Sequence, residues 1–77
     1  MELQMISRDY HGFLLEDAIN DLNCVIGEVR MAEKTEFAEF ITGHGVIRAA
    51  LHSILKVHGL DPSYKLGNEG TIVVTIE

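Results

Sequence analysis

Cysteine is scarce in this sequence, and so are the features that mark secreted or membrane-embedded proteins. The 77 residues include one cysteine, Cys24, so no internal disulfide can form. Proteins without disulfides are typical of reducing compartments, and we therefore expect a cytoplasmic protein. Glu2 precedes any basic residue, no signal-peptide core follows, and no apolar run approaches the roughly 20 residues that cross a bilayer. We expect no membrane partner.

Basic residues are scarce as well. Six Lys and Arg stand against twelve Asp and Glu, which gives a net charge of −6. Because long-range attraction to phosphate requires positive surface, this balance excludes strong non-specific binding to DNA. A local basic patch is still compatible with the sequence, and its members would be Arg8, Arg48 and a few lysines or histidines.

Metal-binding patterns are missing too. No cysteine or histidine partner stands at zinc-finger spacing, and His52 and His58 fall on different faces of a predicted helix. A magnesium site needs clustered carboxylates, and only Asp9 is well placed for one. We predict neither a metal site nor a bound cofactor.

What the chain does have is 47% hydrophobic residues and a single proline, which predict one small folded domain over residues 1–77. Apolar spacing predicts the order strand, helix, strand, helix, strand, strand. The expected elements are a strand that leads through Met5 into Arg8-Asp9-Tyr10, a helix over 15–31, a strand over 37–41, a helix from 46 to near Gly59, and strands over 64–66 and 71–76. Right-handed crossovers would place both helices on one face of a mixed four-stranded sheet, which is a two-layer α/β sandwich.

The same pattern makes three local predictions. The strand over 37–41 should be buried, because its apolar residues form a continuous run. Met5 and Met31 should fill gaps in the core. Leu14 should occupy the N-cap of the first helix, where it offers no side-chain oxygen to the helix N–H groups.

Two loops with polar and glycine residues follow the first two predicted strands. Asp9-Tyr10-His11-Gly12 precedes the first helix, and Thr42-Gly43-His44-Gly45 precedes the second. Residues two apart on a strand share a face, so Asp9 and His11 should point the same way at the carboxyl end of their strand. Sites in α/β folds form at that end. We expect both loops and Arg48 to border one concavity that handles phosphate.

These segments resemble the small MutS-related (Smr) domain family over nearly the whole chain. Asp9-Tyr10-His11-Gly12 resembles the family's Asp-x-His-Gly segment, and Ile41-Thr42-Gly43-His44-Gly45 resembles its Ile-[His or Thr]-Gly-x-Gly segment. Ile47-Arg48 resembles its Leu-Arg pair, and Gly70-Thr71-Ile72-Val73-Val74 resembles its glycine-started last strand. It implies a βαβαββ fold similar to the C-terminal domain of the third bacterial translation initiation factor. It also implies a nucleic-acid partner, RNA ahead of duplex DNA, and often endonucleolytic cleavage.

The resemblance maps the family's Asp-x-His pair onto Asp9 and His11. His11 can exchange a proton near neutral pH, while Asp9 can orient its imidazole or deprotonate a ribose 2′-hydroxyl or water. The competing structural roles are a turn-capping aspartate and a histidine hydrogen-bonded to backbone. Tyr10 and Phe13 are the nearest aromatic side chains for stacking a base.

The resemblance also maps the family's phosphate loop onto Gly43 and Gly45. Glycines allow close backbone approach, and helix N–H groups receive anions. His44, Arg48 and Arg8 are the further candidates for phosphate contacts. The two glycines could equally make a plain strand-to-helix turn, and Arg48 could be an ordinary surface arginine. Three functions stay open at this point: a nucleic-acid binder or nuclease, a non-catalytic protein-interaction module with an acidic surface, and a binder of small phosphate compounds.

Overall fold

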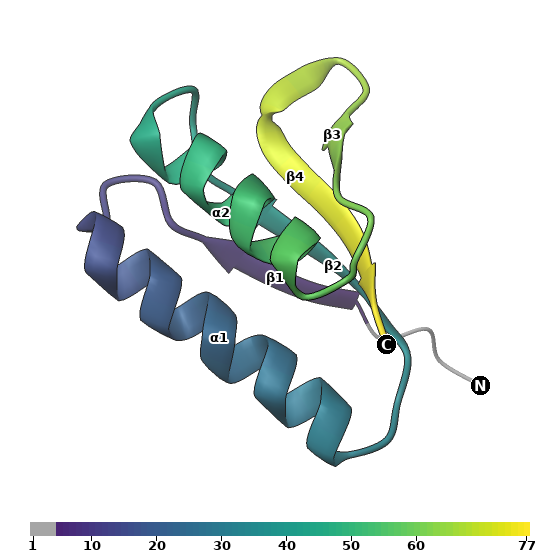
Figure 1. The fold of residues 1–77 in the computed structure, drawn as a ribbon. Coiled ribbons are helices and arrows are strands. Elements are labelled where there is room, and N and C mark those ends of the chain that lie inside the picture. Colours follow the sequence, from purple (N-terminus) through teal and green to yellow (C-terminus); the bar gives the residue numbers. More distant parts are fainter. Residues whose placement is uncertain (1–4) are drawn as a thin grey trace.

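A mixed four-stranded sheet forms one layer of the protein, and two helices form the other (Figure 1). The computed structural model describes residues 5–77. Its elements are β1 (Met5–Asp9), α1 (Leu15–Met31), β2 (Glu36–Ile41), α2 (Val46–Val57), β3 (Ser63–Lys65) and β4 (Asn68–Ile76). The strands lie in the order β1-β2-β4-β3, with β1 and β2 parallel and the other neighbours antiparallel. The predicted two-layer α/β sandwich with βαβαββ order is confirmed.

The core lies between the helices and one face of the sheet. Alternate residues of the strands are buried there, because successive side chains of a strand point to opposite faces. The sheet contributes Ala38, Phe40, Ile72, Val74 and Ile76, Tyr10 follows directly after β1, and the helices contribute Ala18, Leu22, Val25, Ile26, Val29, Leu51 and Leu55. Each fully buried Leu, Ile or Phe stabilises the fold by roughly 1.5–3 kcal/mol.

The other face of the sheet is open, which corrects two predictions. Only Ala38 and Phe40 of β2 are buried, whereas Phe37 is 43% exposed, because the helices cover a single face. Met5 on the open face and Met31 at the end of α1 are also exposed, so neither methionine fills the core. Over residues 5–77, neither helix has the length and apolar character needed to cross a membrane.

The helix limits agree with the sequence-based prediction. Leu14 is the N-cap of α1 and makes no side-chain cap hydrogen bond, as expected. α2 ends at Val57, and Gly59 follows with a φ of +80°, a left-handed conformation that glycine adopts without strain.

The last two strands begin earlier than predicted, at Ser63 and Asn68. A β-bulge at Tyr64 and Lys65 brings Lys65 opposite Asn68. The connecting turn therefore shrinks to two residues, and β4 gains three residues at its start.

Candidate nucleic-acid interface

The carboxyl ends of β1 and β2 lie side by side. The strands are parallel, with Asp9 opposite Ile41, and the Tyr10 N–H donates to the Ile41 carbonyl oxygen at 2.8 Å. The loops that lead into α1 and α2 therefore meet at one edge of the sheet, as Figure 1 shows. The two loops are neighbours, as the sequence predicts.

Asp9 and His11 form a turn rather than the end of a strand. β1 ends at Asp9, so the alternation that would align the two side chains does not extend to His11. Asp9 Oδ1 accepts the backbone N–H of His11 at 2.9 Å, and both residues are exposed. Asp9 thus caps its own turn, and its second carboxylate oxygen and the His11 imidazole lie at the surface beside Gly12.

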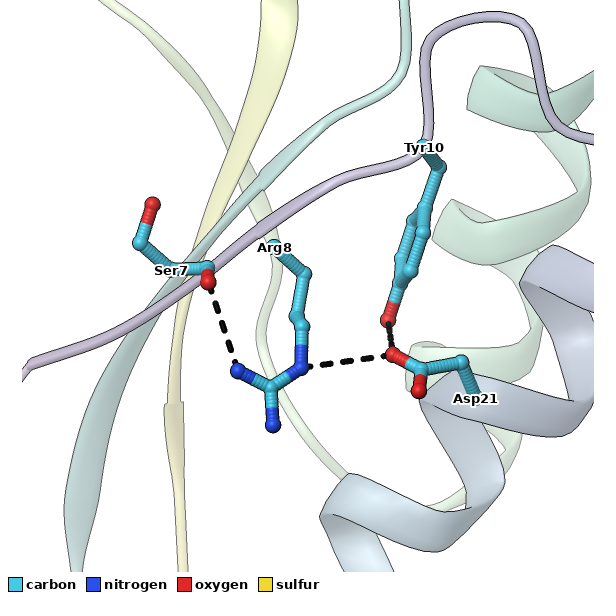
Figure 2. A network of polar contacts seen from close by, with 4 residues as sticks. All are labelled: Ser7, Arg8, Tyr10 and Asp21. Atoms are coloured by element: carbon cyan, nitrogen blue, oxygen red, sulfur yellow. Dashed lines mark hydrogen bonds and ion pairs between the residues drawn. The ribbon is translucent and has the colours of Figure 1, made fainter.

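Tyr10, which stands between Asp9 and His11 in the sequence, belongs to the core. Its ring is 1% exposed and stacks on Phe40 with centroids 5.8 Å apart, so it cannot stack a base. Its hydroxyl donates to Asp21 Oδ2 on α1 at 2.6 Å (Figure 2). Burial, reinforced by the Asp21 hydrogen bond, raises the pKa of Tyr10 far above its usual range.

Arg8 is engaged in the same contact. Its Nε lies 3.4 Å from the Asp21 Oδ2 that accepts from Tyr10, and its Nη1 donates to the Ser7 carbonyl at 3.4 Å (Figure 2). Arg8 pairs in register with buried Phe40, which places it on the helix-covered side of the sheet. Its guanidinium therefore helps to attach β1 to α1, and this placement does not favour the predicted role at the glycine loop.

The glycine loop is fastened to the start of β4. The N–H groups of Thr42 and Gly43 donate to the Gly70 carbonyl at 2.8 and 3.0 Å, and the Thr42 hydroxyl lies 3.2 Å from the same oxygen. Gly43 has a φ of +72°, a left-handed conformation that a side chain would strain. A Cβ at Gly70 would approach His44 Cε1 to 3.2 Å. The loop therefore depends on Gly43 for its shape and is held in place by hydrogen bonds to the Gly70 carbonyl.

The start of α2 is the better anion site of the two helix starts. The Gly43 N–H is already taken, so the donors that remain are the amide groups at the first turn of α2, which have no intrahelical acceptor. Gly45 is the N-cap and makes no side-chain cap hydrogen bond, and the first turn holds no acidic residue. The first turn of α1 holds Glu16 and Asp17, which repel an anion.

Arg48 lies in the first turn of α2, on the side that faces β3 and β4. Its Nη1 donates to the Glu69 carbonyl at 3.0 Å, and Glu69 is next to Gly70, whose carbonyl accepts the hydrogen bonds of the glycine loop. Its Cζ lies 4.7 Å from the centre of the Tyr64 ring, and the His52 ring lies 5.2 Å from the same ring. One of the five guanidinium N–H donors is used by Glu69, and the others are available to a ligand.

The predicted concavity is not where the structure places a cavity. A cavity of about 230 Å³ lies between β1 and the second half of α1 and is bordered by Ile6, Val25, Val29 and Ala32 and by charged side chains. None of Asp9, His11, Gly43 and Arg48 borders it. Within the candidate site, Asp9 and His11 lie on the β1 side and Arg48 lies on the β4 side.

Charge is divided unevenly along the chain. Residues 42–66 carry three basic side chains, Arg48, Lys56 and Lys65, against the single acid Asp61, and they also hold three of the four histidines. The other residues carry three basic and eleven acidic side chains. The glycine loop, α2 and β3 are thus the net positive part of an acidic chain, and residues 42–66 are called the positive region below. Lys65 in this region pairs with Glu39 of β2 at 3.0 Å. This division can be read from the sequence by counting charge per segment rather than per chain.

Comparisons with protein-family models, curated proteins and solved structures give no match. Within the described part of the chain, no group of three or more His, Cys, Asp or Glu side chains could hold a metal ion. Sequence reasoning missed Tyr64 as part of this surface. The available signal was the spacing of Arg48 and His52, which puts two planar groups on one face of α2.

Proposed function

We propose that this chain is an Smr-like domain that binds nucleic acid, single-stranded RNA ahead of duplex DNA, through the start of α2. The observation that supports it most is the uncapped first turn of α2, free of acids and flanked by His44 and Arg48, within the positive region of residues 42–66. A phosphate there would accept backbone N–H groups and one guanidinium.

The charge distribution favours a short single strand as the ligand. A duplex presents phosphates over a wide surface, whereas the positive region is small and eleven acids lie outside it. Two or three phosphate contacts from residues such as His44 and Arg48 correspond to a log–log salt slope of about −2 for a single strand. A slope near zero would contradict an electrostatic contact.

A matched pair of variants at Gly45 tests the site. A Cβ there meets nothing within 4 Å, so both Gly45→Asn and Gly45→Asp fit. The two side chains share shape and a capping oxygen, and both should hold or slightly raise the melting temperature. Only Asp brings a negative charge to the phosphate position, so Gly45→Asp should bind RNA roughly tenfold or more weakly than Gly45→Asn.

Fluorescence anisotropy with a labelled single-stranded RNA and the matching DNA duplex measures this difference. Lys34→Gln is the control for net charge, because Lys34 is exposed and lies in the loop before β2, outside the positive region. Equal RNA affinity of the two Gly45 variants would show that no phosphate of the RNA lies at the start of α2. Failure of the unmodified protein to bind any RNA or DNA would instead favour the protein-interaction module.

A second candidate function is RNA cleavage by Asp9 and His11. The observation in its favour is that both side chains are exposed at the same sheet edge as the glycine loop. Asp9 orients its own turn with one oxygen, which leaves the other to accept a proton, and the His11 imidazole can act as the second proton-transfer group.

A further inference from the structure

Tyr64 of strand β3 presents a partly exposed aromatic ring that packs against helix α2. The Arg48 guanidinium lies 4.7 Å from its centroid, and the His52 ring stacks on it at 5.2 Å with an angle of 29° between planes. Arg48 and His52 are four residues apart, on one face of α2. Tyr64 nevertheless stays 41% exposed. Two planar groups therefore fix the ring while part of it faces solvent.

The same arginine connects this ring to the proposed phosphate position. Arg48 stands in the first turn of α2, contacts Tyr64 with its guanidinium and donates to the Glu69 carbonyl. Glu69 precedes Gly70, whose carbonyl accepts hydrogen bonds from the N–H groups of the glycine loop. The Arg48 side chain thus connects the Tyr64 ring to the start of α2.

We propose that Tyr64 stacks a base of the single-stranded nucleic acid whose phosphate lies at the start of α2. The inference rests on the proposed function and adds the base contact to it. Proteins that bind single strands combine a positive groove with aromatic rings, because every base offers a π-face whatever its sequence. Here the ring is oriented in advance by Arg48 and His52, so little side-chain entropy is lost on stacking. Binding should depend on the presence of bases but only weakly on their order.

The surroundings of the ring favour a base over an apolar protein side chain. Tyr64 has the Arg48 guanidinium over its ring and the His52 ring stacked on it, whereas Lys65 beside it in the chain pairs with Glu39 of β2 at 3.0 Å. Two other aromatic residues have similar accessibility: Phe13 in the loop before α1, whose ring centroid lies 5.4 Å from that of Tyr10, and Phe37, which lies on the opposite face of the sheet. Its neighbour in the chain is Glu36, and Glu39 follows on the same face. Phe37 is therefore the matched control for an exposed aromatic residue that contacts neither Arg48 nor His52.

The test compares two oligomers and three variants. The probes are a single-stranded RNA and a ribose-phosphate strand of equal length that carries no bases. The unmodified protein should bind the RNA roughly tenfold or more tightly than the base-free strand. Tyr64→Leu keeps apolar bulk without the aromatic face, so it should bind both probes with the affinity that the unmodified protein has for the base-free strand. Tyr64→Phe and Phe37→Leu should preserve the preference for bases.

Tyrosine emission gives a second measurement. The chain has two tyrosines and no tryptophan, so Tyr64 is the sole strong emitter in Tyr10→Phe. RNA should quench that emission, and the base-free strand should not.

The outcomes separate this inference from the proposed function. If Tyr64→Leu still prefers RNA, or loses affinity equally for both probes, Tyr64 has no stacking role and the inference is wrong while the phosphate site stands. The same holds if the unmodified protein binds both probes equally. If it binds neither probe, or if Gly45→Asp binds as well as Gly45→Asn, the proposed function fails and the base contact fails with it.

Discussion

Replacement of Tyr10 by phenylalanine isolates one partly buried hydrogen bond between the end of β1 and α1. The Tyr10 hydroxyl donates to Asp21 Oδ2 at 2.6 Å, and Arg8 Nε lies 3.4 Å from the same oxygen. Phenylalanine keeps the ring that stacks on Phe40 at 5.8 Å and removes only the hydroxyl. The change therefore measures how much this bond contributes to the attachment of the edge strand.

The expected loss is about 1–2 kcal/mol in the free energy of unfolding. Hydrogen bonds to charged groups contribute roughly 1.5–3 kcal/mol, but the Asp21 side chain is 40% exposed, so water replaces part of the lost interaction. For a domain of this size each kcal/mol shifts the melting temperature by about 4–8 °C, so Tyr10→Phe should melt roughly 5–15 °C lower.

The pH dependence of the free energy of unfolding is a second way to detect the Tyr10–Asp21 hydrogen bond. Burial raises the pKa of Tyr10 in the folded protein, whereas the unfolded chain titrates near 10.0. Because the folded state then holds its proton more tightly, the stabilisation is fully present below pH 10 and is lost as pH rises beyond it. Tyr10→Phe lacks this group, so the stability difference between the two proteins should be constant at neutral pH and shrink above pH 10.

Urea unfolding followed by circular dichroism, at neutral pH and at a series of alkaline values, measures both effects. Tyr64→Phe is the control, because it removes the hydroxyl of the exposed tyrosine and should change stability by less than about 0.5 kcal/mol. Equal stability of Tyr10→Phe and the unmodified protein would show that desolvation of Asp21 cancels the bond. A difference that grows above pH 10 would refute the assignment of the raised pKa.

Two further changes test the helix cap and the proposed catalytic pair. Leu14→Thr should stabilise the protein by about 0.5–1 kcal/mol, because it supplies a capping oxygen to a helix that lacks one, and a lower melting temperature would contradict this. Asp9→Asn keeps an oxygen for the His11 N–H, so if Asp9 and His11 transfer protons, Asp9→Asn and His11→Ala should each reduce RNA cleavage by about 10² or more. RNA affinity and melting temperature should change little, and a gel assay in which cleavage survives both substitutions would exclude this role.

Element order and helix limits could be predicted because they depend on local patterns. Helical spacing of apolar residues fixed the expectation for α1, and Gly59 marked the end of α2. An open face of the sheet follows from the expected placement of both helices on one side, but which residues of β2 lie on that face does not follow from the local pattern. Phe37 is apolar like the buried Phe40, and only the packing of both helices on one side decides which of them is covered.

The candidate site was predicted at the level of loops but not of side chains. The parallel pairing of β1 and β2 does bring the two loops together. Arg8, by contrast, pairs with Asp21 of α1, and Tyr10 enters the core. β1 ends at Asp9, two residues before His11, so the alternation of the strand does not align Asp9 with His11. Such outcomes depend on contacts between residues distant in sequence, which periodicity does not encode.

The binding and proton-transfer parts of the proposed site rest on different strands. The glycine loop is held by the Gly70 carbonyl on β4, a central strand, whereas Asp9 and His11 follow β1, an edge strand. Because the end of β1 is attached to α1 through Tyr10 and Asp21, Tyr10→Phe should loosen the turn that holds Asp9 and His11 and leave the proposed phosphate position in place.

A displacement of 1 Å can reduce a reaction rate by about 10². If Asp9 and His11 cleave RNA, cleavage by Tyr10→Phe should therefore fall more than its RNA affinity, at a temperature where the variant is fully folded. Anisotropy and single-turnover cleavage on the same protein sample measure the two quantities. An equal fall in both would mean that the two strands move as one unit, and it would contradict the separation of binding and proton transfer between β4 and β1.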